Sequence, residues 1–286
     1  MSFKITRHLL SGNNVDYLPT RGKDSGPFAE NLPDTIIIHY TAGASLDSSV
    51  QTLRDGNVQA SAHVVVGRDG KTVQLIPFNR IAWHAGRSTW GDRKGLNKYS
   101  IGIEIDNAGR LKKVGDTYQT WWGGTKSEKE VMPGIHRNET RLSYWHTFKE
   151  EQISIVKDLC FTLKDKYNIQ EILGHEEIAP HRKSDPGPAF PLDKIRQLIF
   201  ENRGADEGEL TPEEESEWED KPGVTGIVTA SLLNVRTAPG LNSGIKRDPL
   251  PKNTRVEIVG QEGNWYKVKV YDIGWVSKDY IRTVEM

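Results

Sequence analysis

Cysteine is almost absent from this sequence. Cys160 is the single example among 286 residues, which excludes an intramolecular disulfide and any cysteine-rich zinc site. It lies among apolar residues that recur at helical spacing, namely Ile153, Val156, Leu159, Leu163 and Tyr167. Because a free cysteine usually behaves as a small hydrophobic residue, we predict that Cys160 is a core residue of a helix.

Long hydrophobic runs are also missing. No apolar stretch approaches the roughly 20 residues that a membrane-spanning helix needs, so we expect no membrane insertion. The N-terminal residues include basic side chains but neither a continuous apolar segment nor a small-residue cleavage site. We therefore expect no signal peptide, a cytoplasmic location as synthesised, and action outside the membrane only after lysis or dedicated export.

Charge is nearly balanced in number but not in distribution. The formal net charge is −1, yet residues 201–220 contain ten acidic residues and one basic residue, which leaves +8 for the rest. Such a run is typical of a solvated linker, so we predict a linker over 201–222 between two domains, 1–200 and 223–286. The modest, scattered positive excess suits an anionic polymer but does not indicate nucleic-acid binding.

Strand-like and helix-like patterns alternate in the N-terminal part. The predicted strands are 35–40, 62–66, 72–76 and 101–106, and the predicted helices are 45–54 and 150–167. The two middle strands flank Gly67-Arg68-Asp69-Gly70, a hairpin signal. The mixture predicts an α/β domain, a mixed β-sheet flanked by helices.

Residues 107–148 lack a clear period and are predicted to form an inserted loop region. They contain Trp121-Trp122-Gly123-Gly124, Met132-Pro133-Gly134 and Tyr144-Trp145-His146. Two interpretations remain open for this insert, namely surface decoration packed by its own aromatic residues, or a wall of a substrate cleft.

The C-terminal part shows short β-type runs and no helical period. The runs are 226–229, 232–236, 255–259, 265–270 and 274–277. Their spacing predicts a small all-β barrel of about 60 residues.

Metal-ligand chemistry is concentrated in the loop 174–188, which contains His175 and Asp185. A catalytic zinc ion needs three protein ligands and one open position, and His39 at the end of a predicted strand is the strongest third candidate. A strand-end histidine is also often purely structural. The sequence contains no His-Glu-x-x-His helix, because His175-Glu176-Glu177 is followed by Pro180, so a helical zinc protease is disfavoured.

Six motifs together resemble the zinc-dependent N-acetylmuramoyl-L-alanine amidase type 2 family, over about residues 30–200. They are Ile37-Ile38-His39-Tyr40-Thr41, Ser61-Ala62-His63, Gly67-Arg68-Asp69-Gly70, Ala82-Trp83-His84-Ala85-Gly86, Asn97-Lys98-Tyr99-Ser100-Ile101-Gly102-Ile103-Glu104, and Gly174-His175 with Lys183-Ser184-Asp185-Pro186-Gly187-Pro188. That family includes phage endolysins, wall-recycling amidases and peptidoglycan recognition proteins. The resemblance implies hydrolysis of the amide between N-acetylmuramic acid and L-alanine in peptidoglycan, with one Zn²⁺ per chain.

The resemblance also implies roles for individual residues. It makes His39, His175 and Asp185 the zinc ligands, with Asp in the third place as in the recycling branch. It makes Glu104 the catalytic carboxylate that moves the proton of the attacking water, and Lys183 a cation that stabilises the oxyanion. The residues expected to contact substrate are His84, Asn97 and His63. No role follows for His181, and His8, His136 and His146 are expected to be surface or local packing residues.

A second resemblance, to bacterial SH3-like domains, covers the C-terminal part. It rests on Leu233-Asn234-Val235-Arg236-Thr237-Ala238-Pro239-Gly240, Gly263-Asn264-Trp265-Tyr266-Lys267-Val268 and Gly274-Trp275-Val276-Ser277. In wall hydrolases such domains bind cell-wall peptides, which raises the local enzyme concentration. Trp265, Tyr266 and Trp275 are equally compatible with groove and core positions.

Two other functions remain open at this point, a non-catalytic peptidoglycan recognition protein and a zinc amidase for another amide. The first would be signalled by loss of a ligand, and all three ligands and Glu104 are present. The setting is open between an endolysin, a recycling enzyme and an exported effector, and the wall-binding-like domain favours intact wall as substrate. The sequence leaves the oligomeric state undetermined.

Overall fold

The chain divides into two compact units, Met1–Asn202 and Arg203–Met286. The computed structural model describes residues 3–200, 224–228, 232–240, 243, 245–251, 254–263, 265–269, 273–277 and 281–284. The predicted linker at 201–222 lies outside the described residues, so its boundaries stay a prediction. Among the described residues, no helix is both long enough and apolar enough to cross a membrane.

A six-stranded sheet forms the centre of the N-terminal unit, in the order β17-β5-β11-β6-β7-β3. Its strands are β3 (Val15–Tyr17), β5 (Thr35–Tyr40), β6 (Val64–Val66), β7 (Thr72–Gln74), β11 (Ser100–Ile105) and β17 (Glu171–Gly174). The first four strands in this order run parallel, and β7 pairs with β6 as the predicted hairpin. The strand predictions for this region are therefore confirmed.

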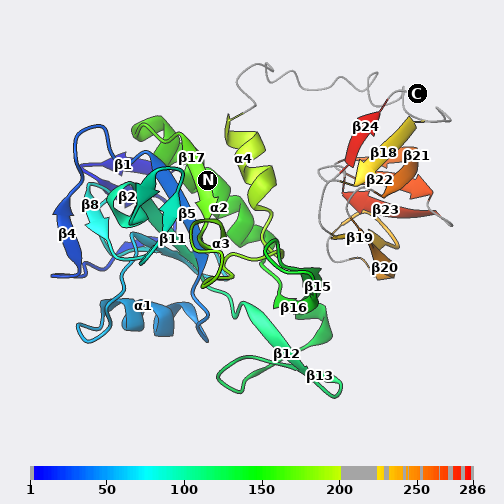
Figure 1. Ribbon diagram of the computed structural model, residues 1–286, viewed down its shortest axis with the longest axis horizontal. Coiled ribbons are helices and arrows are strands. Elements are labelled where there is room, and N and C mark those ends of the chain that lie inside the picture. Colours follow the sequence, from blue (N-terminus) through cyan, green and yellow to red (C-terminus); the bar gives the residue numbers. More distant parts are fainter. Residues whose placement is uncertain are drawn as a thin grey trace. The chain divides into compact units, whose positions relative to one another are not determined.

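Helices cover both faces of this sheet, as Figure 1 shows. They are α1 (Leu46–Arg54), α2 (Glu150–Lys166) and α4 (Leu192–Phe200). Successive side chains of a strand point to opposite faces. Ile36 and Ile38 of β5 pack in the cluster that holds α2 and α4, and Val65 of β6 packs against α1. Cys160 is fully buried in α2, as predicted. The mixed α/β fold is confirmed.

The prediction that residues 107–148 form a loop region is wrong. They form a five-stranded antiparallel sheet in the order β14-β13-β12-β16-β15. Its strands are β12 (Arg110–Val114), β13 (Thr117–Gln119), β14 (Thr125–Lys126), β15 (Val131–Ile135) and β16 (Leu142–His146). The strands are two to five residues long, too short for alternation to be visible. They are stabilised by pairing across long separations, such as Arg110 with Trp145, and by a cluster around Leu111, Tyr118 and Tyr144.

Short elements complete the N-terminal unit. They are β1 (Lys4–Thr6), β2 (Leu9–Ser11), β4 (Asp24–Pro27), β8 (Arg80–Ala82), β9 (Thr89–Trp90), β10 (Arg93–Lys94), the 3-10 helices η1 (Leu96–Lys98) and η2 (Glu128–Glu130), and the one-turn helix α3 (His175–Ile178). Both η1 and α3 border the region described in the next subsection.

The described part of the C-terminal unit is all-β, as predicted. Its antiparallel sheet has the order β20-β19-β23-β22-β21-β18-β24. The strands are β18 (Val224–Val228), β19 (Leu232–Arg236), β20 (Ile245–Pro251), β21 (Arg255–Glu262), β22 (Trp265–Lys269), β23 (Ile273–Ser277) and β24 (Ile281–Val284). Tyr266 is buried in the core of this unit and Trp265 is half-buried, while the side chain of Trp275 lies outside the described residues.

Candidate metal centre

The candidate site lies where three parallel strands of the central sheet end side by side. His39 is on β5, Glu104 on β11 is its register partner, and His175 follows the last residue of β17. Adjacent strands are about 4.8 Å apart, so these chain positions are brought together by the sheet itself. In open α/β sheets the carboxyl ends of the strands are the usual place for a ligand.

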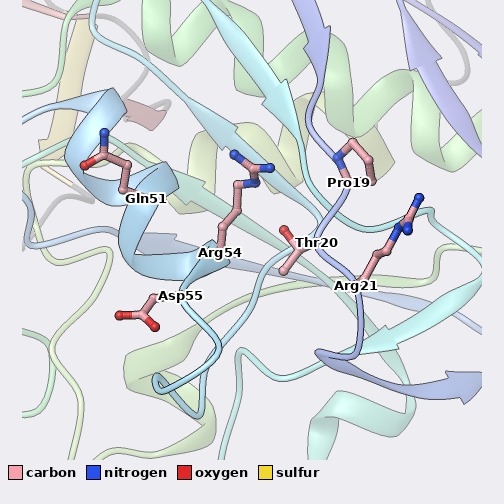
Figure 2. A pocket seen from close by; sticks show the side chains of 6 residues that line it. All are labelled: Pro19, Thr20, Arg21, Gln51, Arg54 and Asp55. Atoms are coloured by element: carbon pink, nitrogen blue, oxygen red, sulfur yellow. The ribbon is translucent and has the colours of Figure 1, made fainter.

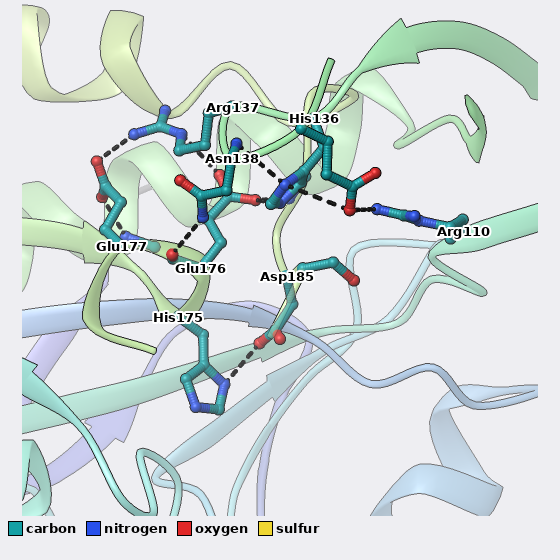
Figure 3. A network of polar contacts seen from close by, with 12 residues as sticks. Arg110, His136, Arg137, Asn138, His175, Glu176, Glu177 and Asp185 are labelled. Atoms are coloured by element: carbon teal, nitrogen blue, oxygen red, sulfur yellow. Dashed lines mark hydrogen bonds and ion pairs between the residues drawn. The ribbon is translucent and has the colours of Figure 1, made fainter. Parts of the chain in front are cut away.

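Three buried side chains converge at this edge. His39 Nδ1, His175 Nδ1 and Asp185 Oδ2 lie 2.9 Å apart in each pair. Figure 3 shows His175 and Asp185 facing one another. Two imidazole nitrogens and one carboxylate oxygen, aimed at a common point, are a donor set that fits a divalent metal ion. The loop from α3 to Asp185 supplies two of the three metal-ligand atoms. A hydrogen bond from Glu176 N–H to the Asp185 carbonyl, 2.8 Å long, closes this loop.

The electrostatics of the cluster favour the forms that bind metal. Burial, reinforced by His175, lowers the pKa of His39 to about 4, so its imidazole is neutral near pH 7. Burial raises the pKa of Asp185, but the adjacent His175 and His39 rings outweigh it and hold the pKa below its usual range. Metal ligands must be neutral imidazole and ionised carboxylate, which is the state these environments produce for His39 and Asp185.

Glu104 and Lys183 lie beside the cluster. Glu104 is partly accessible, but its Oε2 atom is buried and has no hydrogen-bond partner among the described residues. Burial raises the pKa of this carboxyl to about 8, Asp185 adds to the rise, and Lys183 opposes it. Lys183 is half-buried, and its charge also acts on His39. Both residues predicted to be catalytic are therefore within electrostatic reach of the cluster.

His84 and Asn97 are the first two residues predicted to contact substrate. His84 faces the Nε2 edge of the His39 ring, away from the metal cluster, and Asn97 hydrogen-bonds the His84 backbone. His84 is 8% exposed, and its Nδ1 atom is 3.0 Å from His39 Nε2. Asn97 is half-buried, and its Oδ1 atom accepts hydrogen bonds from the N–H groups of His84 (3.0 Å) and Ala85 (2.7 Å). Neighbouring protein groups therefore engage the His84 ring and one polar atom of Asn97.

His63, the third predicted substrate contact, is fully buried. Its Nε2 atom donates to the Arg80 carbonyl at 2.8 Å, and its Nδ1 atom accepts from Gly102 N–H at 3.0 Å. With both ring nitrogens engaged, His63 joins β8 to β11. We therefore replace the prediction of substrate contact for His63 with one of structural support.

A polar network behind the ligand loop was not foreseen from the sequence (Figure 3). Glu176 is 2% exposed, and its carboxylate accepts hydrogen bonds from His136 Nε2 (2.6 Å) and Gly187 N–H (3.1 Å) and forms an ion pair with Arg137 Nε (2.9 Å). Asn138 Nδ2 donates to the Glu176 carbonyl at 2.8 Å. The insert thereby holds the ligand loop between its two metal ligands. The only sequence signal for this network was Glu176, an acidic residue next to the candidate ligand His175. Its partner His136 lies 40 positions away in the chain, so the pairing could not be predicted.

The remaining histidines are not part of the metal cluster. His181 is exposed, in agreement with the absence of a predicted role. His8 contacts the Tyr167 hydroxyl at 2.9 Å. His136 and His146 are both 2% exposed, so the expectation of packing positions is met and that of surface positions is not. Arg182, which the sequence did not single out, donates to the carbonyls of Ala85 and Arg87 and so ties the ligand loop to the segment after β8.

A pocket of about 610 Å³ lies elsewhere, between 19–21 and the end of α1 (Figure 2). Pro19, Thr20, Arg21, Gln51, Arg54 and Asp55 line it. It shares no residue with the metal cluster and holds none of the residues predicted to act in chemistry.

Comparison with known proteins adds two family matches. A family described as N-acetylmuramoyl-L-alanine amidase matches residues 29–188, and one described as bacterial SH3 domain matches residues 231–282. The first match spans the whole metal cluster and every strand of the central sheet except β3, and the second spans most of the all-β unit.

Individual relatives are similar over much of their length. The N-acetylmuramoyl-L-alanine amidase AmiD of Escherichia coli (strain K12) is 31% identical over 243 residues, 78% of this chain and 71% of that protein. The 1,6-anhydro-N-acetylmuramyl-L-alanine amidase AmpD of the same strain is 32% identical over 194 residues, 68% of this chain and 83% of that protein. A solved complex of E. coli AmiD with anhydro-N-acetylmuramic acid-L-Ala-D-gamma-Glu-L-Lys is 29% identical, with a TM-score of 0.46, over 68% of this chain and 65% of that chain.

Proposed function

The chain belongs to the N-acetylmuramoyl-L-alanine amidase family, and we propose that its His39, His175 and Asp185 side chains bind one zinc ion for amide hydrolysis. The bond cleaved is the amide between the lactyl group of N-acetylmuramic acid and L-alanine in peptidoglycan. The observation that carries this proposal is the convergence of three metal-type ligand atoms beside the unpaired, buried Oε2 atom of Glu104.

Zinc is the metal that suits this donor set. Two histidines and one carboxylate, with further coordination left for water or substrate, are typical of catalytic zinc sites. When bound, zinc acts as a Lewis acid that lowers the pKa of water and polarises a carbonyl. The ligand atoms His39 Nδ1, His175 Nδ1 and Asp185 Oδ2 would hold the ion.

Glu104 and Lys183 divide the remaining chemistry. Glu104 has a carboxylate oxygen with no hydrogen-bond donor among the described residues, so in its ionised form it can accept the proton of the attacking water and return it to the leaving amine. Lys183, near Glu104 and His39, places a positive charge where the carbonyl oxygen becomes negative. A positive group also favours the ionised form of Glu104, which is the form that accepts a proton.

The non-catalytic recognition function is disfavoured, because all three ligands converge and Glu104 is present on the strand next to His39. AmpD is named a 1,6-anhydro-N-acetylmuramyl-L-alanine amidase, and the solved AmiD complex contains an anhydro-N-acetylmuramic acid peptide as its substrate. We propose that muropeptides and the peptidoglycan polymer are both substrates here. The match to a bacterial SH3 domain supports a wall-binding role for the C-terminal unit, and hence action on wall after lysis or export.

Digestion of purified sacculi, followed by mass spectrometry, tests the activity. We expect free peptides that begin with L-alanine, loss of this release after chelation, and recovery when zinc is restored. His39→Ala, which lacks one ligand, is the control and should neither bind zinc nor release peptides. Glycan fragments that keep their peptides after digestion with the zinc-loaded enzyme would contradict the proposed reaction.

A further inference from the structure

The segment His84–Ala85 contacts both ligand histidines on the ring edge that faces away from the metal cluster. His84 Nδ1 lies 3.0 Å from His39 Nε2, and the Ala85 carbonyl lies 3.1 Å from His175 Nε2. The two residues are adjacent in the chain, yet they reach ligands that are 136 positions apart. One short stretch of backbone therefore adjoins two of the three proposed zinc ligands.

Two backbone carbonyls fix which ring nitrogens carry hydrogen. A carbonyl can only accept, so His175 Nε2 donates to Ala85 and its Nδ1 atom keeps a lone pair when the ring is neutral. Arg182 Nη2 also lies 3.3 Å from His175 Nε2, but its two hydrogens are donated to the carbonyls of Ala85 and Arg87. His84 Nε2 faces the Ser100 carbonyl at 3.2 Å and must likewise donate. His84 Nδ1 is then an acceptor, so His39 Nε2 donates to it and His39 Nδ1 also keeps a lone pair. Both lone pairs point at Asp185 and at one another, which is the metal position.

Asn97 holds the backbone of this segment in place. Its single Oδ1 atom accepts from the N–H groups of both His84 and Ala85, at 3.0 and 2.7 Å. Gly102 of β11 provides the room, because a Cβ atom there would lie 2.3 Å from the His84 ring. The His84 ring is thus confined between β11 and His39, and it has little freedom to reach a substrate.

We propose that His84, the Ala85 carbonyl and Asn97 form an orienting layer that presents Nδ1 of both ligand histidines to the metal. His84 and Asn97 are then positioning residues for zinc rather than the substrate contacts that their motifs imply. The proposal rests on the metal centre proposed above. Groups that hydrogen-bond metal-ligating histidines fix the ring orientation, and their removal typically weakens metal affinity about 10- to 100-fold.

Paired variants at position 84 test the first half of this proposal. His84→Leu removes the acceptor, whereas His84→Asn keeps an oxygen at the place of Nδ1. We expect zinc affinity, measured by competition with a chelator, to fall about 10-fold or more in His84→Leu and to recover in His84→Asn. In the zinc-loaded protein with ¹⁵N-labelled histidine, the Nε2 proton of His39 should exchange faster with solvent in His84→Leu. The Nε2 proton of His175, held by Ala85, should not change.

Paired variants at position 97 separate positioning from substrate contact. Asn97→Asp keeps an acceptor oxygen but loses the amide donor, and Asn97→Leu loses both. Positioning predicts weaker zinc binding, a lower kcat and an unchanged KM in Asn97→Leu, with zinc affinity retained in Asn97→Asp. This half-buried site also keeps the test available if His84→Leu does not fold. Circular dichroism and the Nε2 proton of His63 serve as folding controls.

The outcomes separate this inference from the function on which it rests. If the unaltered protein binds no zinc, the metal centre and the orienting layer are both overturned. If it binds zinc and both leucine variants bind it within about twofold, the orienting layer alone is overturned. A raised KM at unchanged zinc affinity would likewise overturn it and restore His84 and Asn97 as substrate contacts.

Discussion

The Glu104 side chain occupies an energetically unfavourable position. It sits on a strand buried on both faces, its Oε2 atom has no hydrogen-bond partner among the described residues, and burial raises its pKa to about 8. A buried polar atom left unpaired costs about 1–3 kcal/mol or more, so this residue is poorly explained by folding alone. A free oxygen beside a metal cluster is what a proton acceptor requires.

The role of Glu104 can be tested by removing its basicity alone. Glu104→Gln keeps the shape of the side chain, so we expect kcat to fall about 10²- to 10⁴-fold while zinc affinity stays within a few-fold. Initial rates on a soluble muropeptide and chelator competition measure the two effects. Substantial residual activity in a zinc-loaded Glu104→Gln protein would assign the proton transfer to another group.

The raised pKa of Glu104 also predicts a pH-dependent stability in the metal-free protein. Its folded pKa of about 8 exceeds the usual 4.5, so the folded state holds the proton more tightly and the free energy of unfolding falls as pH rises between these values. Glutamine does not titrate. After chelation, urea unfolding should therefore give Glu104→Gln a larger free energy of unfolding than the unaltered protein at high pH. The difference should be absent at pH 4, grow to a few kcal/mol as pH rises, at about 1.4 kcal/mol per unit of pKa, and level off above pH 8. Parallel pH profiles for the two proteins would contradict it.

At the scale of elements, the insert supports the loop that carries two of the three metal ligands. Glu176 lies between His175 and Asp185 in that loop. It accepts a hydrogen bond from His136 and pairs with the charge of Arg137, and both residues follow β15. Trp145 of β16 packs close to Gly187, where a Cβ atom would lie 2.8 Å from its ring. A loop rich in proline and glycine is thereby held by the side chains of a separate sheet.

Loss of one support should loosen this loop. His136→Ala removes a donor to a carboxylate that is 2% exposed, so we expect the free energy of unfolding to fall by about 3 kcal/mol and zinc binding to weaken. Asp16→Asn, which breaks the exposed pair with Lys71, is the matched control and should change neither quantity measurably. Urea unfolding and chelator competition measure both. Equal effects of the two variants would argue against a supporting role for the insert.

The interpretation of the insert as a cleft wall stays a prediction. Trp121 at the β13–β14 turn is 76% exposed, and its indole N–H donates to the Ala42 carbonyl at 2.8 Å. Ala42 is three residues beyond His39, so the turn reaches the chain segment that follows a metal ligand. The alternative, packing by its own aromatic residues, is met by Tyr118 and Tyr144, whose ring centroids are 5.0 Å apart.

At the scale of the whole molecule, two units have separate cores and separate family matches. If the C-terminal unit binds wall, tethering raises the local concentration of the catalytic unit at an insoluble substrate. Deletion of 203–286 should then slow release of peptides from sacculi about 10-fold or more and leave the rate on soluble muropeptides unchanged. Comparing the two substrates with both proteins measures this, and equal losses on both would point to a role in folding instead.

Regular elements with a strong period were predictable. Residues 35–40 formed a strand at the predicted positions because a β-branched run bounded by turn residues has few alternatives. The insert was not predictable, since Arg110 must find Trp145 across 35 positions and neither short strand shows alternation by itself. The hydrogen bonds of His63 and His84 to other parts of the protein were not predictable for a similar reason. A histidine in a sequence motif gives the same signal whether its side chain contacts substrate or another part of the protein.

The sequence by itself determined which side chains are available for the chemistry of the site and which predicted strand or loop carries each of them. It placed His39 and Glu104 on strands and His175, Lys183 and Asp185 in one loop, because those identities and spacings are local properties of the chain. Only the tertiary structure decided how they act together. Parallel pairing of β5 with β11 and β17 brings His39, Glu104 and His175 to one edge, and contacts from His84 and Ala85 to the Nε2 atoms of the two ligand histidines leave the Nδ1 atoms directed at the cluster. Such decisions depend on directional hydrogen bonds between segments far apart in the chain, which no local pattern records.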